Sequence, residues 1–282
     1  MDGLAVTSRG LRSSGRGVAV HVAAAILLVV AFVLVPGMVA GWGSEGGIGD
    51  EGELRDALRV AFAGYWSSGA GEFSPALDDV VEYWFRYHVV KALIAVVLLG
   101  VLVALASVLW KAVGRKGDSG RGRRIALGTA GAGVMMFALV ALVAVMANVQ
   151  GALVPYASVL PMLFDEAVGP ELAGTLEDVG RQLAASAGAG ASPALDVMID
   201  DFARYHVVMA VIAAVVAVGF AVASVVLWKR RAGRSSGERR VLAGSGVLAV
   251  GLAVVFLVVA VANTTTVADP VPALRALFDG GW

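Results

Sequence analysis

Five long apolar runs constrain the fold of this 282-residue chain more than any other feature. An α-helix needs about 20 predominantly apolar residues to cross a hydrocarbon core that is about 30 Å thick. Each run meets that length with few titratable side chains inside it. The runs cover residues 18–41, 87–110, 125–147, 205–228 and 241–263. The sequence therefore predicts an all-α integral membrane protein with five transmembrane helices.

Composition supports this class and excludes several chemistries. Hydrophobic residues make up 59% of the chain and charged residues 16%, whereas a soluble domain usually has about 25% charged residues. There is no cysteine, which excludes disulfides, thiolate metal sites and cysteine nucleophiles. The segments that flank or join the predicted spans are 1–17, 42–86, 111–124, 148–204, 229–240 and 264–282.

Basic residues are concentrated on one side of the predicted membrane. Of the 22 Lys and Arg residues, 15 lie in segments 1–17, 111–124 and 229–240, together with only 3 of the 22 acidic residues. The positive-inside rule places these three segments in the cytoplasm, and the two long loops and the C-terminal tail outside. We expect a multi-pass plasma-membrane protein, and the heavy use of Ala, Val, Gly and Arg favours a bacterial source.

The first run has an alternative interpretation as a cleaved signal peptide, because basic residues precede it and small residues end it. The apolar stretch within 18–41 is longer than the roughly 7–15 residues of a typical signal-peptide core. In addition, "RSSGRGVAV" at Arg12 resembles "RSSGERRVL" at Arg234, which leads into the fifth run. We therefore favour retention of the first run as a transmembrane helix.

Much of the chain is repeated at an offset of 118 residues. "SPALDDVVEYWFRYHVV" begins at Ser74 and "SPALDVMIDDFARYHVV" at Ser192, and the match continues to Lys111 and Lys229. Similarity over this length indicates an internal duplication. Each copy contains two spans, so the chain returns to the same side and both copies share one orientation.

The outer loops are expected to contain helices of their own. The Ser-Pro pairs at Ser74 and Ser192 are typical of an N-cap followed by proline at the first helical position. No helix breaker follows, so each helix is expected to begin about 12 residues outside the membrane and to continue into it. Shorter helices are expected over 53–65 and 171–184, which would make each outer loop a small helical cap.

A charged face is predicted on each of these two helices. Acidic, acidic and basic residues follow one another at intervals of four, which places each trio on one side of an α-helix. A solvated or self-paired face explains the trios, and a face that binds a partner is the alternative. A histidine follows each trio, where a pH switch or an ordinary interfacial contact is possible. This candidate interaction face comprises Asp78, Glu82, Arg86, His88, Asp196, Asp200, Arg204 and His206.

Glycines cluster early in the third and fifth spans, at Gly128, Gly131, Gly133, Gly244, Gly246 and Gly251. Small residues let helix backbones approach closely, so we expect these positions to mark helix packing, with a kinked, substrate-binding helix as the alternative. Lys91 lies one turn inside the second span, and Met209 occupies the matching position in the second copy. We expect Lys91 to reach toward the interface in a structural role.

These observations favour a non-enzymatic membrane subunit that acts through its acidic outer loops. The span interiors have few polar side chains, which argues against a proton or ion pathway, although a transporter or channel component remains the alternative. No spacing indicates a metal site, and no cofactor is expected. Expected partners are anionic lipids at the basic loops, and an envelope protein or a second copy of the chain at the outer loops. Nucleic acid is not expected, because no basic domain exists.

Overall fold

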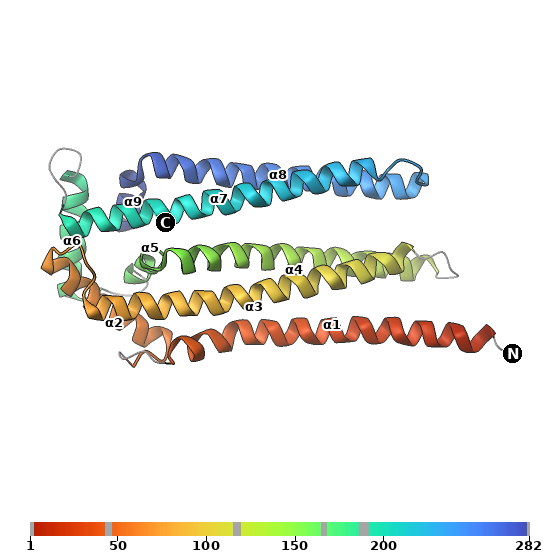
Figure 1. The fold of residues 1–282 in the computed structure, drawn as a ribbon, viewed down its shortest axis with the longest axis horizontal. Helices are drawn as coiled ribbons and strands as arrows, with labels where there is room; N and C mark the ends of the chain where they lie inside the picture. Colours follow the sequence, from red (N-terminus) through yellow and green to blue (C-terminus); the bar gives the residue numbers. More distant parts are fainter. Residues whose placement is uncertain (1–2, 43–46, 115–119, 165–167, 186–191, 281–282) are drawn as a thin grey trace. The chain divides into compact units, whose positions relative to one another are not determined.

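The computed structural model describes residues 3–42, 47–114, 120–164, 168–185 and 192–280, with side chains from residue 16 onward. Over these residues the chain forms nine α-helices and one 3₁₀ helix, and no strand (Figure 1). The prediction of an all-α chain with five membrane-length helices is confirmed, because five helices are long and apolar enough to cross a membrane. They are α1 (Gly3–Ala40), α3 (Pro75–Gly114), α4 (Arg121–Leu153), α7 (Pro193–Lys229) and α8 (Ser236–Ala268).

Five shorter helices complete the described chain. They are α2 (Glu51–Ser68), α5 (Pro155–Val159), the 3₁₀ helix η1 (Leu160–Phe164), α6 (Pro170–Ala185) and α9 (Pro270–Phe278). Three of them, α5, η1 and α9, were not expected from the sequence. They occupy segments that apolar periodicity alone did not distinguish from loop or tail, because each is only five to nine residues long.

Local hydrogen bonds explain where several helices begin and end. The Ser192 hydroxyl accepts from the Leu195 backbone N–H at 3.3 Å, and Ser74 accepts from Leu77 at the same distance. Each serine therefore satisfies one of the N–H groups left unpaired at a helix start. At the other end of a helix, Gly69 stops α2 with φ of 64°, a left-handed conformation that side chains disfavour.

The chain divides into two compact units, which are described separately. The first consists of Met1–Ser44 and Arg86–Val149 and the second of Glu45–Phe85 and Gln150–Trp282. In the first unit, α1 runs beside α3 and α4 (Figure 1). Its core is formed by Leu102, Ala138 and Ala141, against which Ala25 of α1 packs.

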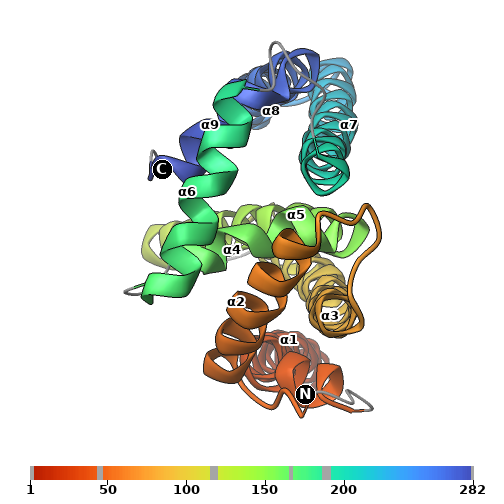
Figure 2. The same ribbon diagram turned by 90° about the vertical axis from the view of Figure 1, so that its left-hand side faces the viewer.

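The second unit joins the hairpin of α7 and α8 to a group of short helices. The two long helices lie side by side in both ribbon views (Figures 1 and 2). We call α2, α5, η1, α6 and α9 the cap. The core that the cap forms with the first turn of α7 contains fully buried leucines and aromatic residues, among them Leu54, Leu58, Phe62, Tyr65, Tyr156, Leu160, Leu163, Leu195 and Leu274. Residues from both long loops and from the C-terminal tail thus share one apolar core.

Candidate functional site

A groove of about 550 Å³ lies in the second unit, beside the first turns of α3. Three carboxylates from α3 line it together with apolar side chains from α3 and from the corner between α4 and α5. The lining residues are Asp78, Asp79, Val81, Glu82, Phe85, Ala152, Leu153 and Pro155. We refer to this feature as the acidic groove. It contains Asp78 and Glu82 of the interaction face predicted from the sequence, and adds Asp79 and the apolar residues.

The corner that forms one wall of the acidic groove follows from the local sequence. Proline has no N–H and fits the first position of a helix, so Pro155 ends α4 and begins α5. Val154, between the two helices, has an extended φ of −139° and is 4% exposed. The Trp84 indole N–H donates to the Ser158 hydroxyl at 2.8 Å, which joins α3 to α5 across the wall.

The acidic groove combines negative charge with exposed apolar surface. Asp78 and Glu82 are exposed and Asp79 is half-buried. Leu153 is 63% exposed and Phe85 is 40% exposed. Asp78 lies in the first turn of α3, where the helix dipole favours negative charge. The groove can therefore receive a group that carries both positive charge and apolar surface.

The second trio lies on α7 in the same unit. Asp196, Asp200 and Arg204 are all exposed. The adjacent Asp201, which sequence reasoning did not select, is less exposed, and its carboxylate accepts from the Ala157 backbone N–H at 3.2 Å. The Asp201 carboxylate thus holds α5 instead of lining an open surface.

Arg86 and His88 lie in the first unit. The Arg86 guanidinium donates to the Trp42 carbonyl at 3.0 Å, which joins α3 to the residues just after α1. The His88 ring contacts Tyr87 edge to face at 5.7 Å between centroids. Arg86 thus has a structural contact, and neither residue lines the acidic groove.

His206 has a defined partner on the neighbouring helix. Its Nδ1 lies 2.8 Å from the Asn263 side-chain oxygen, and the Asn263 amide donates to the Val259 carbonyl at 2.8 Å. Since the Asn263 side-chain nitrogen donates to Val259, its side-chain oxygen faces the ring as an acceptor. Nδ1 of His206 is therefore the donor. The His206 Nε2 is buried without a hydrogen-bond partner among the described residues. This arrangement joins α7 to α8.

The glycines predicted to pack divide into two groups. A Cβ atom on Gly131 would lie 3.3 Å from Nε1 of Trp110, and one on Gly246 would lie 2.6 Å from Nε1 of Trp228. Both positions therefore lie against the tryptophan of the preceding helix. A Cβ atom at any of the other four would meet nothing within 4 Å: Gly128, Gly133, Gly244 and Gly251. Among the residues that the structure describes, a side chain at those four positions would meet no neighbouring helix.

The cap contains a polar link that sequence reasoning missed. The Trp66 indole N–H of α2 donates to the Asp178 carboxylate of α6 at 2.8 Å, and Gln182 donates to the same oxygen at 2.8 Å. Hydrogen bonding from Trp66 is the main cause that lowers the pKa of Asp178, with smaller contributions from Gln182 and Arg181. At the offset of 118, Trp66 corresponds to Ala184 and Asp178 to Val60, so the sequence repeat gave no signal for the pair.

Two buried tyrosines lie in the aromatic part of the cap core. The ring centroid of Phe73 lies 5.5 Å from that of Tyr65 and 4.7 Å from that of Tyr156. Neither tyrosine hydroxyl has a hydrogen-bond partner among the described residues. Burial raises the pKa of both phenols, that of Tyr156 strongly. Because both rings are enclosed, they serve packing in this structure.

Within the described part of the chain, no group of three His, Asp or Glu side chains is arranged to hold a metal ion. Comparisons with protein-family models, with curated proteins and with solved structures found no match to the chain. The geometry of the acidic groove is therefore the main guide to function.

Proposed function

We propose that this chain is a non-enzymatic plasma-membrane protein that binds a partner protein through the acidic groove. The groove supports this proposal because its carboxylates border exposed apolar side chains, a combination that suits a protein surface better than a solvated face. The partner segment should carry Lys or Arg side chains for Asp78, Asp79 and Glu82, and an apolar side chain for Phe85 and Leu153.

The proposed topology places the groove outside the cytoplasm. The basic segments 1–17, 111–124 and 229–240 face the cytoplasm by the positive-inside rule, and the cap faces outward. The basic segments would then meet anionic headgroups, each basic residue near the surface contributing about 1 kcal/mol. A bacterial source would make the partner an envelope protein.

The two related helix starts differ in what their carboxylates contact. Both copies contribute an acidic helix start, at Asp78 and at Asp196. In the first copy the carboxylates border a groove with exposed Phe85 and Leu153. In the second copy Asp201 is used to hold Ala157. We assign binding to the first copy.

Site-specific photo-cross-linking of the full-length protein in its own membrane tests this proposal. A photoreactive amino acid at Leu153 should give one defined, stoichiometric adduct, and Asp78→Asn with Glu82→Gln should abolish it. The matched control is Asp196→Asn with Asp200→Asn, which removes the same charge from the second copy and should leave the adduct unchanged. An adduct that survives the first pair of substitutions, or the absence of any protein adduct at Leu153, would refute partner binding at the groove.

A transporter or channel component is the second candidate, and its supporting observation is that cavities lie beside the spans. Those between α1, α3 and α4 and between α7 and α8 are lined almost entirely by apolar side chains, whereas a hydrated path needs polar lining. The chain has no cysteine, so single cysteines through α4 and α8 can be tested with water-soluble reagents. Continuous labelling along one face would favour transport over partner binding.

A further inference from the structure

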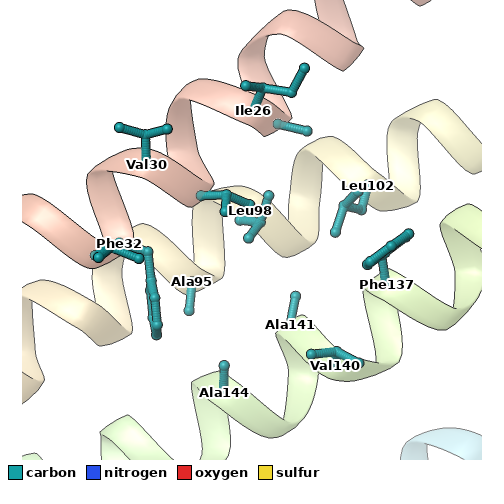
Figure 3. A pocket seen from close by; sticks show the side chains of 13 residues that line it. Ile26, Val30, Phe32, Ala95, Leu98, Leu102, Phe137, Val140, Ala141 and Ala144 are labelled. Carbon is teal, nitrogen blue, oxygen red and sulfur yellow. The ribbon is translucent and has the colours of Figure 1, made fainter.

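An apolar cavity of about 500 Å³ lies in the first unit, between α1, α3 and α4 (Figure 3). Its size is within the roughly 300–1,000 Å³ typical of ligand pockets. Side chains from all three helices surround it, including Val30 and Phe32 of α1, Leu98 of α3 and Val140 of α4. Small residues leave the space open, since Ala95, Ala141 and Ala144 line it without filling it. This feature is separate from the acidic groove.

One cation lies at the end of this cavity. The Lys91 ammonium is 4.9 Å from the centroid of the Phe32 ring and 4.6 Å from that of Tyr87. Phe32 lines the cavity, and Ala95, one helical turn beyond Lys91, lines it too. Lys91 is half-buried, and no carboxylate of the described residues pairs with it. Two aromatic faces hold the charge in place without neutralising it.

The dimensions of the cavity and the position of Lys91 match one leaflet of a bilayer. Lys91 and Leu102, the first and last of these positions on α3, are eleven residues apart, or about 16 Å along the helix. Half of a hydrocarbon core of about 30 Å is about 15 Å. A molecule with a charged end at Lys91 and an apolar end near Leu102 would therefore have the length of a lipid in a single leaflet.

We infer that the first unit binds one anionic phospholipid, with an acyl chain in the cavity between α1, α3 and α4 and the headgroup phosphate at Lys91. The cavity lies between membrane-length helices, so an occupant without polar groups suits it and water does not. The unpaired ammonium at its end selects for negative charge. Met209 replaces Lys91 in the second copy, so the site belongs to the first copy alone.

Native mass spectrometry of the purified full-length protein tests the inference. The protein is reconstituted in vesicles that contain equal amounts of phosphatidylglycerol and phosphatidylcholine, and retained lipid is counted after extraction into mild detergent. The wild type should retain one phosphatidylglycerol per chain. Lys91→Met, which introduces the residue of the second copy, should lower that retention about fivefold, as expected for the loss of one interfacial cation. Ala144→Leu, which fills the cavity, should abolish it.

Two control variants distinguish this site from general effects. Arg204→Met removes the same charge from α7, outside both the cavity and the basic segments, and Ala253→Leu fills the cavity between α7 and α8. Both should retain phosphatidylglycerol as the wild type does. Thermal unfolding shows whether each variant is folded, and if Ala144→Leu is not, Lys91→Met decides the question. Unchanged retention in Lys91→Met, equal retention of both lipids, or a lipid-free dimer would overturn the inference.

Discussion

The hairpins α3–α4 and α7–α8 carry the same tryptophan–glycine contact but differ in the polar side chains that lie beside it. Trp110 meets Gly131 in the first hairpin and Trp228 meets Gly246 in the second. In the second hairpin a hydroxyl crosses between the helices, since Ser224 donates to the Gly246 carbonyl at 3.0 Å, and no such bond joins the described residues of α3 and α4. The tryptophan–glycine contact is thus common to both hairpins, whereas the contact from Ser224 belongs to the second.

The cavities beside the two hairpins also differ in the helices and side chains that surround them. The cavity along α3 and α4 is lined on a third side by α1, and Lys91 lies over Phe32, one of its lining residues. The smaller one, of about 390 Å³, lies along α7 and α8, and the chain has Met209 at the position that corresponds to Lys91. If the chain arose by duplication, the two cavities show that a ligand site is expected at positions where the two copies differ in sequence, such as Lys91 and Met209.

The largest effect is expected at the glycine with the closest tryptophan contact. Gly246→Ala should lower the stability of the protein by about 1–3 kcal/mol, because its Cβ would overlap the Trp228 indole. Gly131→Ala, with a 3.3 Å approach to Trp110, should cost less. Thermal unfolding in detergent measures both. Gly244→Ala is the control and should be neutral or stabilising, since alanine favours helices by up to about 1 kcal/mol. A cost at Gly244 equal to that at Gly246 would contradict the packing difference.

A smaller effect should separate two asparagines at matching ends of α4 and α8. Asn263→Leu should destabilise by about 1–2 kcal/mol, because it leaves the donor Nδ1 of His206 unpaired. Asn148→Leu should have little effect, since the Asn148 amide donates only to the Ala144 carbonyl of its own helix. Thermal unfolding of the two variants gives the comparison. Equal costs would show that the contact to His206 does not distinguish the hairpins.

The link between Trp66 and Asp178 tests a contact that joins α2 of the first outer loop to α6 of the second. Trp66→Phe should keep the buried ring and remove the N–H donor, at a cost of about 1 kcal/mol because the carboxylate is partly exposed. Hydrogen exchange in α2 and α6 should increase together. A change confined to α2 would mean that the link does not hold the two helices.

The smallest effect expected is on the pH dependence of the cap. The lowered pKa of Asp178 means that the folded cap favours the ionised carboxylate. The contribution of Asp178 to the stability of the folded cap is fully present above the ordinary aspartate pKa of about 3.9. It is lost as the pH falls through the lowered pKa of Asp178 in the folded protein. Hydrogen exchange in α6 should therefore increase in that acidic range. Asp178→Asn should remove this component, and an unchanged acid profile in that variant would contradict the assignment.

Sequence patterns within a single segment predicted the parts of the fold that form without contacts to distant segments. Apolar length gave the five membrane-length helices, and the serine of each Ser-Pro pair caps a helix start in the structure. The 3₁₀ helix η1 and the helix α9 make contacts between distant segments, such as Phe164 with Phe278 at 5.4 Å. No pattern within either segment reveals such a contact.

The candidate sites were predictable only in part, for the same reason. Helical spacing placed Asp78 and Glu82 on one face, but the apolar wall around Leu153 comes from α4 and α5. The sequence alone predicts a structural role for Lys91, which Met209 replaces at the matching position. Its relation to a cavity depends on α1, which lies more than fifty residues earlier in the chain. A run of glycines likewise does not specify which of them faces a tryptophan.

The most direct test of the proposed topology uses two single cysteines in a chain that has none. Ser67 is exposed on α2 of the cap, and Ser236 is exposed at the start of α8, beside the basic loop. The two variants are Ser67→Cys and Ser236→Cys. A membrane-impermeant maleimide applied to intact cells should label the cysteine at 67 and should reach the one at 236 only after permeabilisation. Labelling of both positions in intact cells, or of 236 alone, would contradict a membrane protein whose cap and basic loops lie on opposite sides with the cap outside.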